Sequence, residues 1–423
     1  MQPKGEGHET PLSLAGLIDR PSEKDTALPK QTIRDLDLKG RKVLVRVDFN
    51  VPQTVDGAIS DDRRIKAALP TLNFALDAGA SLILVSHLGR PIGDPLTDEV
   101  YRLDRVAARL GELLGRPVTK VNDTVGSEAN AAAAALQPGE VVLLENVRFN
   151  PGEKKGDPEF AKQLGLLADV YVNDAFGTCH RNEASMVAVP RQFLAQDRGI
   201  GFLVEKELQI LDTLLKNPKH PMVAIMGGAK VSDKIGVIEN LLPKIDKLLI
   251  GGAMTYTFLA AQGHPIGKSR VEADKLDEAR KLLELAGDKL VLPVDHLMTE
   301  TLNPDSRTWV VAGSDLPDDG IGIDIGPETV KLYNEILASA GTVVWNGPMG
   351  KFEDEPFRKG TLGVAEGMAK SSGITVVGGG ETAEAVERFG FADKVTHVST
   401  GGGAFLECLE GKSFNSLAAI ADR

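Results

Sequence analysis

Short apolar runs rich in valine, isoleucine and leucine alternate with longer stretches of helical periodicity from Lys42 onward. Nearly continuous apolar runs are typical of strands covered on both faces, and helical stretches between them are typical of crossovers in a parallel sheet. The first set of runs covers 42–50, 81–87, 141–146 and 169–174. The second set covers 222–228, 247–252, 289–295, 342–347, 374–380 and 395–403. The pattern therefore predicts two parallel sheets with helices between their strands.

A helical stripe separates the two sets of strands. It consists of Leu203, Leu208, Leu211 and Leu215, and the pattern ends at Pro218. We therefore predict an α/β protein of two Rossmann-like domains, each a parallel sheet flanked by helices, joined by a hinge helix. The predicted division is a first domain over 31–200, a connecting helix over 201–217 and a second domain over 218–404.

Composition excludes several classes of protein, and the cytoplasm is the expected location. Residues 1–30 lack strong periodicity and are expected to form a disordered tail, whose acidic residues argue against a transit peptide. There is no apolar run of about 18 residues, so no membrane span is expected. The net charge of -12, from 48 Lys+Arg against 60 Asp+Glu, opposes a general nucleic-acid surface. Cys179 and Cys408 are too few for a disulfide framework and are compatible with a reducing compartment.

Basic and hydrogen-bonding residues follow the strands of the first set, where the carboxyl ends of a parallel sheet bind ligands. They are Arg64, Arg90, Arg148 and Arg181, with His87, His180, Asp48 and Asn50 near them in sequence. One arginine alone is usually a surface partner of an acid, but four of them favour an anion, which guanidinium binds bidentately. Asp48 and Asn50 fit a substrate hydroxyl or an ordinary turn, and the two histidines fit a site or the core.

Glycine gathers after the strands of the second set, and the chain contains 45 glycines. The segment MGGAKVSDK passes from strand to helix, and we expect Lys230 and Lys234 one turn apart on the same helix face. Lysines in a first helical turn oppose the helix dipole, and a bound anion would remove that conflict. The alternative is pairing with Asp233 or Glu239. The turns at 378–382 and 401–403 repeat the pattern, which favours phosphate binding.

Two familiar motifs come close to a match in this region. GHPIGKS has three residues between Gly263 and Gly267 where a P-loop has four, so we interpret it as an ordinary loop. Gly378, Gly380 and Ala383 fit the dinucleotide fingerprint, but no acidic residue follows the next strand. A nucleotide-dependent dehydrogenase is therefore one rival hypothesis, and a hinged solute-binding protein is the other.

The order of the motifs carries a close resemblance. RVDFNVP, RIKAALPTL, SHLGRP, LENVRF, GTCHR, GGAKVSDK, WNGPMGKFE, GGGET and STGGG resemble the successive signatures of the phosphoglycerate kinase family, from about Thr32 to the end of the chain. The resemblance implies a hinge-closing, Mg²⁺-dependent enzyme that reversibly transfers the acyl phosphate of 1,3-bisphosphoglycerate to ADP, giving 3-phosphoglycerate and ATP. It also implies that segment 405–423 returns to the first domain, and we expect a monomer.

The resemblance also implies site residues, position by position. The phosphoglycerate would be held by Asp48, Asn50, Arg64, His87, Leu88, Gly89, Arg90, Arg148 and Arg181. The nucleotide would be held by Lys230, Lys234, Gly322, Glu353, Gly379, Gly380, Glu381 and Thr382. Catalysis would fall to Arg64 and Lys230, helped by helix N-termini at Gly380 and Gly403. Glu381 stands where the family usually has Asp and is the candidate magnesium ligand, while Phe405 stands where a small residue is common.

Overall fold

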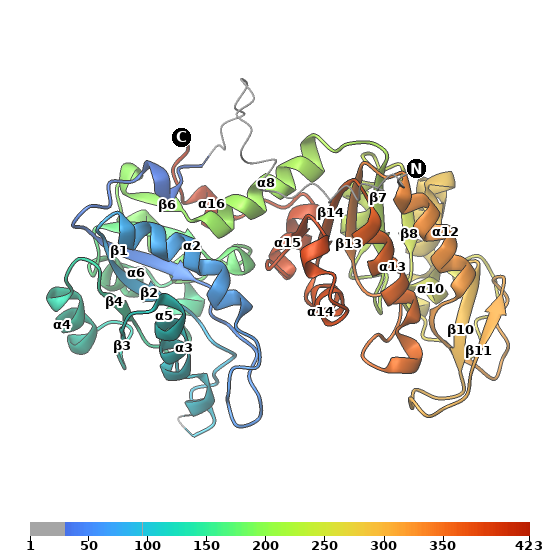
Figure 1. Ribbon diagram of the computed structural model, residues 1–423, viewed down its shortest axis with the longest axis horizontal. Coiled ribbons are helices and arrows are strands. Elements are labelled where there is room, and N and C mark those ends of the chain that lie inside the picture. The colour runs from blue at the N-terminus through green and yellow to red at the C-terminus, as the bar shows by residue number, and fades with distance from the viewer. Residues whose placement is uncertain (1–29, 95) are drawn as a thin grey trace, which may run out of the picture. The chain divides into compact units, whose positions relative to one another are not determined.

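The computed structural model describes residues 30–94 and 96–423, which form two compact units (Figure 1). The first unit contains residues 30–209 and Ser413–Arg423, and the second contains Ile210–Lys412. The division falls inside α8 (Phe202–Lys216), the helix predicted over 201–217. The tail was predicted over residues 1–30; residues 1–29 lie outside the described residues, and Lys30 pairs with Asp422 at 2.6 Å.

The first unit is built on a parallel sheet of strand order β3-β4-β2-β1-β5-β6. The strands are β1 (Lys42–Val47), β2 (Ser81–Val85), β3 (Val118–Lys120), β4 (Val141–Leu143), β5 (Val170–Asp174) and β6 (Arg198–Ile200). The central strand β1 pairs with β2 and β5, and its residues from Val43 onward are buried, as an apolar run covered on both faces requires. The short strands β3 and β6 were not predicted.

Helices flank this sheet. They are α2 (Arg63–Asp77), α3 (Asp104–Leu114), α4 (Ser127–Ala135), α5 (Pro151–Lys155), α6 (Pro158–Gly165), α7 (Ala184–Val187) and, from the C-terminal segment, α16 (Asn415–Ala418). Local chemistry fixes their ends: the Asp157 carboxylate accepts the Phe160 N–H at 2.8 Å and caps α6, and Gly115 ends α3 in the left-handed region. Ser416 of α16 donates to the Cys179 carbonyl at 2.6 Å, which ties the last segment to this unit.

The second unit contains a second six-stranded parallel sheet, of order β15-β14-β13-β7-β8-β9. Its strands are β7 (Met222–Met226), β8 (Lys247–Ile250), β9 (Leu290–Val291), β13 (Thr342–Asn346), β14 (Ile374–Gly378) and β15 (His397–Val398). Its helices are α9 (Ile235–Leu241), α10 (Met254–Ala261), α11 (Leu276–Ala286), α12 (Pro327–Ala338), α13 (Lys359–Lys370), α14 (Gly380–Arg388) and α15 (Gly403–Leu409). Trp345 and Tyr333 lie fully buried in its core. The predicted α/β fold class is confirmed.

One element of the second unit differs from the prediction. The run over 289–295 is not one strand, because β9 ends at Val291 and a new strand, β10 (Asp295–Thr299), starts an antiparallel sheet. This sheet has the order β11-β10-β12, with β11 (Thr308–Ala312) and β12 (Ile321–Ile325). The segment expected to return to the first domain over 405–423 does so later in the chain. Residue 405 lies inside α15, which packs on α9, and the chain joins the first unit from Ser413 onward.

Candidate active site

A buried arginine lies under the carboxyl ends of the first sheet. The Nε of Arg46 donates to Ser185 Oγ at 2.8 Å, and its guanidinium also donates to the Val47 carbonyl. Its Nη2 lies 3.3 Å from His87 Nδ1. Because a guanidinium has only donors, His87 Nδ1 must accept, which leaves the ring neutral with its proton on Nε2.

The charges around His87 show that the predicted arginines converge. The pKa of His87 is held well below its ordinary value of 6.5, first by burial and then by the positive charges of Arg46, Arg148, Arg181 and Arg64. Positive charges favour the neutral ring only when they lie near it. Three of the four arginines predicted after strand ends, Arg64, Arg148 and Arg181, therefore lie near His87, as an anion site requires.

This pKa predicts how the stability of the protein depends on pH. The unfolded chain binds a proton at His87 below about pH 6.5, but the folded chain does not, so the free energy of unfolding should fall as the pH drops below that value, by at most about 1.4 kcal/mol per pH unit. Urea unfolding at pH 7.5 and 5.5 checks this. His87→Gln should show a smaller difference than wild type, and equal pH dependence of the two proteins would contradict the prediction.

Asp48 and Asn50 both make tertiary hydrogen bonds beyond an ordinary turn. The Asp48 carboxylate accepts from Arg64 Nη1 at 2.6 Å and lies 3.9 Å from His87 Nδ1. Asn50 Oδ1 accepts the Gly89 N–H at 2.8 Å. Gly89 has φ +61°, and a Cβ there would meet the ring of Tyr101, so glycine is required in this loop. These bonds hold Arg64 and the loop after β2 at one edge of the sheet.

Arg148 and Arg181 share an acidic partner that sequence reasoning missed. Arg148 lies on the short helix η3 (Val147–Phe149), is 7% exposed, and donates to the Gly89 carbonyl at 2.8 Å and to Glu183 Oε1 at 2.7 Å. Arg181 Nη1 lies 3.6 Å from the same oxygen. Burial opposes ionisation of Glu183, but the positive charges of Arg46 and Arg148 lower its pKa. Glu183 lies two residues after the GTCHR motif, and this nearness in sequence is the only signal that could have identified it.

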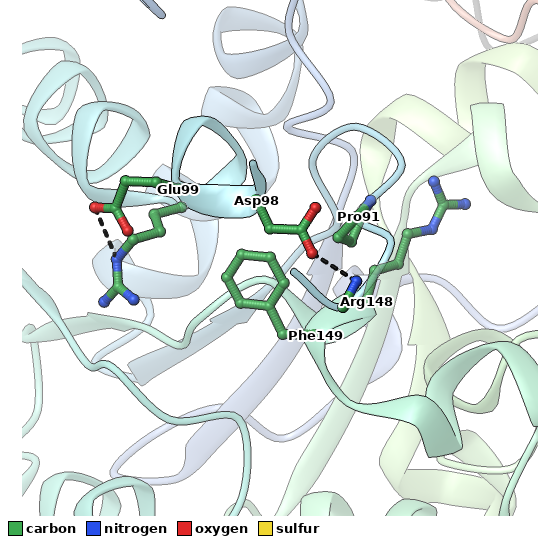
Figure 2. A pocket seen from close by; sticks show the side chains of 7 residues that line it. Pro91, Asp98, Glu99, Arg148 and Phe149 are labelled. Carbon is green, nitrogen blue, oxygen red and sulfur yellow. Dashed lines mark hydrogen bonds and ion pairs between the residues drawn. The ribbon is translucent and has the colours of Figure 1, made fainter. Parts of the chain in front are cut away.

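Arg90 differs from the other predicted arginines because it is exposed and has no ion pair with any described residue. Its loop continues into a pocket of about 280 Å³ (Figure 2). The pocket is lined by Pro91, Gly93, Asp98, Glu99, Arg102, Arg148 and Phe149. The Asp98 carboxylate accepts the N–H of Gly93 at 2.7 Å and so closes this loop on itself. Arg148 therefore borders both the arginine cluster and a hollow beside it.

A larger pocket, of about 470 Å³, lies in the second unit at the carboxyl ends of its strands. Three of the predicted residues, Gly322, Glu353 and Glu381, line it. The other lining residues are Gly228, Ala229, Gly252, Ala253, Lys268, Arg270, Leu302, Ile321, Ile323, Pro348, Gly350 and Lys351. Lys268 belongs to the segment GHPIGKS, predicted to be an ordinary loop, and Arg270 follows that segment directly; sequence reasoning missed the place of both in the pocket.

The glycine turn at the start of α14 is built around Asn346. Asn346 Nδ2 donates to the Gly378 carbonyl at 2.7 Å, and its Oδ1 accepts from the Lys234 ammonium. Thr382 Oγ accepts the Gly347 N–H at 2.7 Å. Gly379 has φ +92°, and a Cβ built on Gly380 would meet nothing within 4 Å. The space beside Gly380 is open and no side chain caps α14, so the N–H groups of its first turn are available to a phosphate.

The two lysines are not on one helix face as predicted. Helix α9 begins at Ile235 with Lys234 as its N-cap, and Lys230 lies in the loop before it. The helical hydrogen bonds of this segment start at Val231, whose carbonyl accepts the N–H groups of Lys234 and Ile235 at 2.8 and 3.1 Å, so Lys230 precedes the turn. The Ser232 N–H and hydroxyl donate to the Glu272 carboxylate, at 3.1 and 2.6 Å, and so hold this turn in place. Burial lowers the pKa of Lys234, against the opposing effects of Asp233, Glu381 and Glu410. Lys230 is exposed and has no ion pair with a described residue, Asp233 and Glu239 included.

The turn over 401–403 also starts a helix, because α15 begins at Gly403. The unusual residue beside it, Phe405, is fully buried. Its ring occupies the place where a Cβ of Gly378 would lie, so the glycine before the α14 turn makes room for the larger side chain. The difference at 405 is therefore accommodated in the core.

A family model described as Phosphoglycerate kinase matches residues 33–412 of the chain. The chain belongs to the phosphoglycerate kinase family. A phosphoglycerate kinase of Rhodopirellula baltica is 54% identical over 389 residues, which cover 92% of this chain and 98% of the relative. One of Pelotomaculum thermopropionicum is 52% identical over 399 residues, which cover 94% and 100%.

Solved structures of phosphoglycerate kinases are similar to this chain throughout. That of Coxiella burnetii has a TM-score of 0.82 at 40% identity, and that of Pyrococcus horikoshii has a TM-score of 0.81 at 32% identity. Each match covers 92% of this chain and 98% of the solved chain. The predicted family and two-domain fold are confirmed, and both rival hypotheses, the dehydrogenase and the solute-binding protein, are wrong.

Members of the phosphoglycerate kinase family are phosphotransferases with a carboxyl group as acceptor, so the chain is an enzyme of this class. In the described part of the chain, no helix is long and apolar enough to cross a membrane. No group of three or more His, Cys, Asp or Glu that could hold a metal ion is found among the described residues.

Proposed function

We propose that the protein transfers the acyl phosphate of 1,3-bisphosphoglycerate to ADP, reversibly and with Mg²⁺. The observation that carries this proposal is the pairing of two kinds of site in one chain of this family. One unit holds an arginine cluster at its strand ends, with Arg148 buried and Arg64 and Arg181 partly exposed, and the other holds an open glycine turn beside Lys234. The first suits a small phosphorylated acid and the second suits a nucleotide phosphate.

On the acid side, Arg64, Arg148, Arg181 and the exposed Arg90 supply bidentate donors for a phosphate and a carboxylate. Asp48 and Asn50 accept hydrogen bonds from Arg64 and Gly89, and a substrate hydroxyl would donate to the same acceptor oxygens. His87 is neutral and carries its proton on Nε2, so it acts as a hydrogen-bond donor and not as a cation. Leu88 is buried, and Gly89 lets the backbone of the loop approach a ligand.

On the nucleotide side, the phosphates would lie on the turn over Gly379–Thr382, with Lys234 and Lys230 beside them and Gly322 and Glu353 toward the ribose. Glu381 is exposed, lines the same pocket and offers the hard oxygen ligand that Mg²⁺ prefers. The ion, when bound, would neutralise charge on the nucleotide phosphates. Glutamate has the same carboxylate as the aspartate usual in the family, so the residue fits the role.

The transfer needs no general base, because the attacking oxygen is already ionised as a phosphate or a carboxylate. Alignment and charge stabilisation then account for the rate. We assign the stabilisation of the transferring group to Arg64 and Lys230, with the helix N-termini at Gly380 and Gly403. Both helices begin at those residues, so their unpaired N–H groups are available.

Each substrate has its groups in a separate unit, so both units must come together around both substrates for the reaction to occur and for water to be excluded. We therefore propose a hinge-closing monomer that acts in the cytoplasm. Small-angle scattering should show compaction only when 3-phosphoglycerate and a nucleotide are both present. An unchanged radius of gyration with both ligands would contradict closure.

A coupled assay with ATP, Mg²⁺ and 3-phosphoglycerate tests the proposed reaction directly. ADP formation that depends on all three components is the expected result. Titration with NAD in place of ADP is the control for ligand class. Absence of turnover, together with binding of neither ATP nor 3-phosphoglycerate, would refute the proposal.

A further inference from the structure

The loop over 267–270 is anchored to the strand β12. The Lys268 N–H donates to the Gly320 carbonyl at 2.9 Å, and the Gly322 N–H donates to Ser269 Oγ at 2.9 Å. Ser269 is buried, whereas its neighbours Lys268 and Arg270 are exposed. The loop is therefore held at Ser269, and it brings both flanking side chains to the wall of the larger pocket.

These two cations have no acidic partner within residues 30–94 and 96–423, since neither makes an ion pair there. Lys351, a third cation of the pocket wall, is different because it is paired with Asp354 and donates to the Leu302 carbonyl. An exposed cation without a partner can donate to a ligand without first breaking an ion pair. Lys268 and Arg270 are thus free donors at a pocket of about 470 Å³.

Strand order places the pair far from the phosphate turn. The turn over Gly379–Thr382 follows β14, and β13, β7 and β8 succeed it across the sheet. The step from β14 to β8 is three strand spacings, or roughly 14 Å. Lys268 and Arg270 line the same pocket as Gly252 and Ala253, which follow β8 directly. A nucleotide whose phosphates lie on the turn would therefore bring its base toward Lys268 and Arg270.

We propose that Lys268 and Arg270 recognise the purine base of the nucleotide, an inference that rests on the proposed nucleotide site. Both purines present the N7 acceptor, and guanine adds the O6 acceptor beside it, a pair that arginine or lysine donors match. The two residues thus strengthen binding of either purine nucleotide, and of a guanine nucleotide more. They set base preference and do not take part in phosphoryl transfer.

Isothermal titration of the full chain with ADP, GDP and inorganic pyrophosphate tests this assignment without relying on turnover. The double variant Lys268→Ala/Arg270→Ala should raise the Kd of ADP about fivefold and that of GDP about tenfold or more. The Kd of pyrophosphate should stay within about twofold of wild type, since it has no base.

The matched control removes two exposed cations from the same unit, with Lys281→Ala/Lys331→Ala on α11 and α12. It should leave all three Kd values unchanged. An equal loss for pyrophosphate and the nucleotides would overturn the proposal in favour of general attraction to phosphate, and unchanged nucleotide binding would overturn it outright. A wild-type chain that binds neither nucleotide would instead refute the proposed function.

Discussion

Replacing Arg64 with alanine is expected to lower kcat by about two to three orders of magnitude, the usual cost of removing one donor from developing charge. The expectation follows from the position of Arg64 in the arginine cluster, held there by the Asp48 carboxylate at 2.6 Å. The coupled assay measures kcat and both KM values. A larger effect on kcat than on either KM would mark an interaction made in the transition state.

The neighbouring arginine provides the control for this experiment. Arg63 is more exposed, and it donates to Asp61 outside the cluster. Arg63→Ala should therefore leave kcat within about twofold of wild type, as a surface ion pair contributes little. Equal activity of the two variants would refute the assignment of Arg64 while leaving the family membership intact. Arg64→Lys keeps the charge but loses the planar guanidinium, so its kcat should lie between those of wild type and Arg64→Ala.

Gly379→Ala is expected to raise the KM for ATP by about tenfold or more, which corresponds to about 1.4 kcal/mol of binding free energy. The φ of +92° at this residue is unfavourable for alanine. The added Cβ would also lie 2.5 Å from Asn346 Nδ2, the donor that holds the Gly378 carbonyl. The turn must then shift, and its N–H groups would no longer be placed to donate to the phosphates.

Gly390→Ala separates backbone strain from damage to the site. Gly390 has φ +74°, and a Cβ there meets nothing within 4 Å. This variant should lose stability in thermal unfolding but keep the KM for ATP. If both variants raise the KM equally, the effect comes from general destabilisation, and the phosphate turn at Gly379 is not the nucleotide site.

Most of the fold could be predicted because its strands are buried on both faces and so appear as uninterrupted apolar runs. The connecting helix α8 was predicted for a similar reason, since its leucine stripe ends at Pro218. The antiparallel sheet was not predicted. Its edge strand β11 alternates between exposed and half-buried residues over only five positions, which is a weak signal beside loops of similar composition.

The candidate site was predictable where one residue type recurs after several strands, as the arginines and glycines do. It was not predictable where position depends on a tertiary bond. The turn before α9 is held at Ser232, whose N–H and hydroxyl donate to Glu272, 40 residues away, and Lys230 lies outside that turn. Lys268 and Arg270 were missed likewise, because only the contacts of their loop with β12 bring them to the pocket.

The bonds of Asn346 make two parts of the nucleotide site thermodynamically dependent on each other. One amide side chain accepts from Lys234 and donates to Gly378, so it joins the N-cap of α9 to the strand that leads into α14. Groups that share a partner have a coupling energy and do not contribute independently. The losses of ADP affinity caused by Lys234→Ala and Gly379→Ala should therefore fail to add in a double-mutant cycle, so the lysine and the glycine turn cannot be tuned separately.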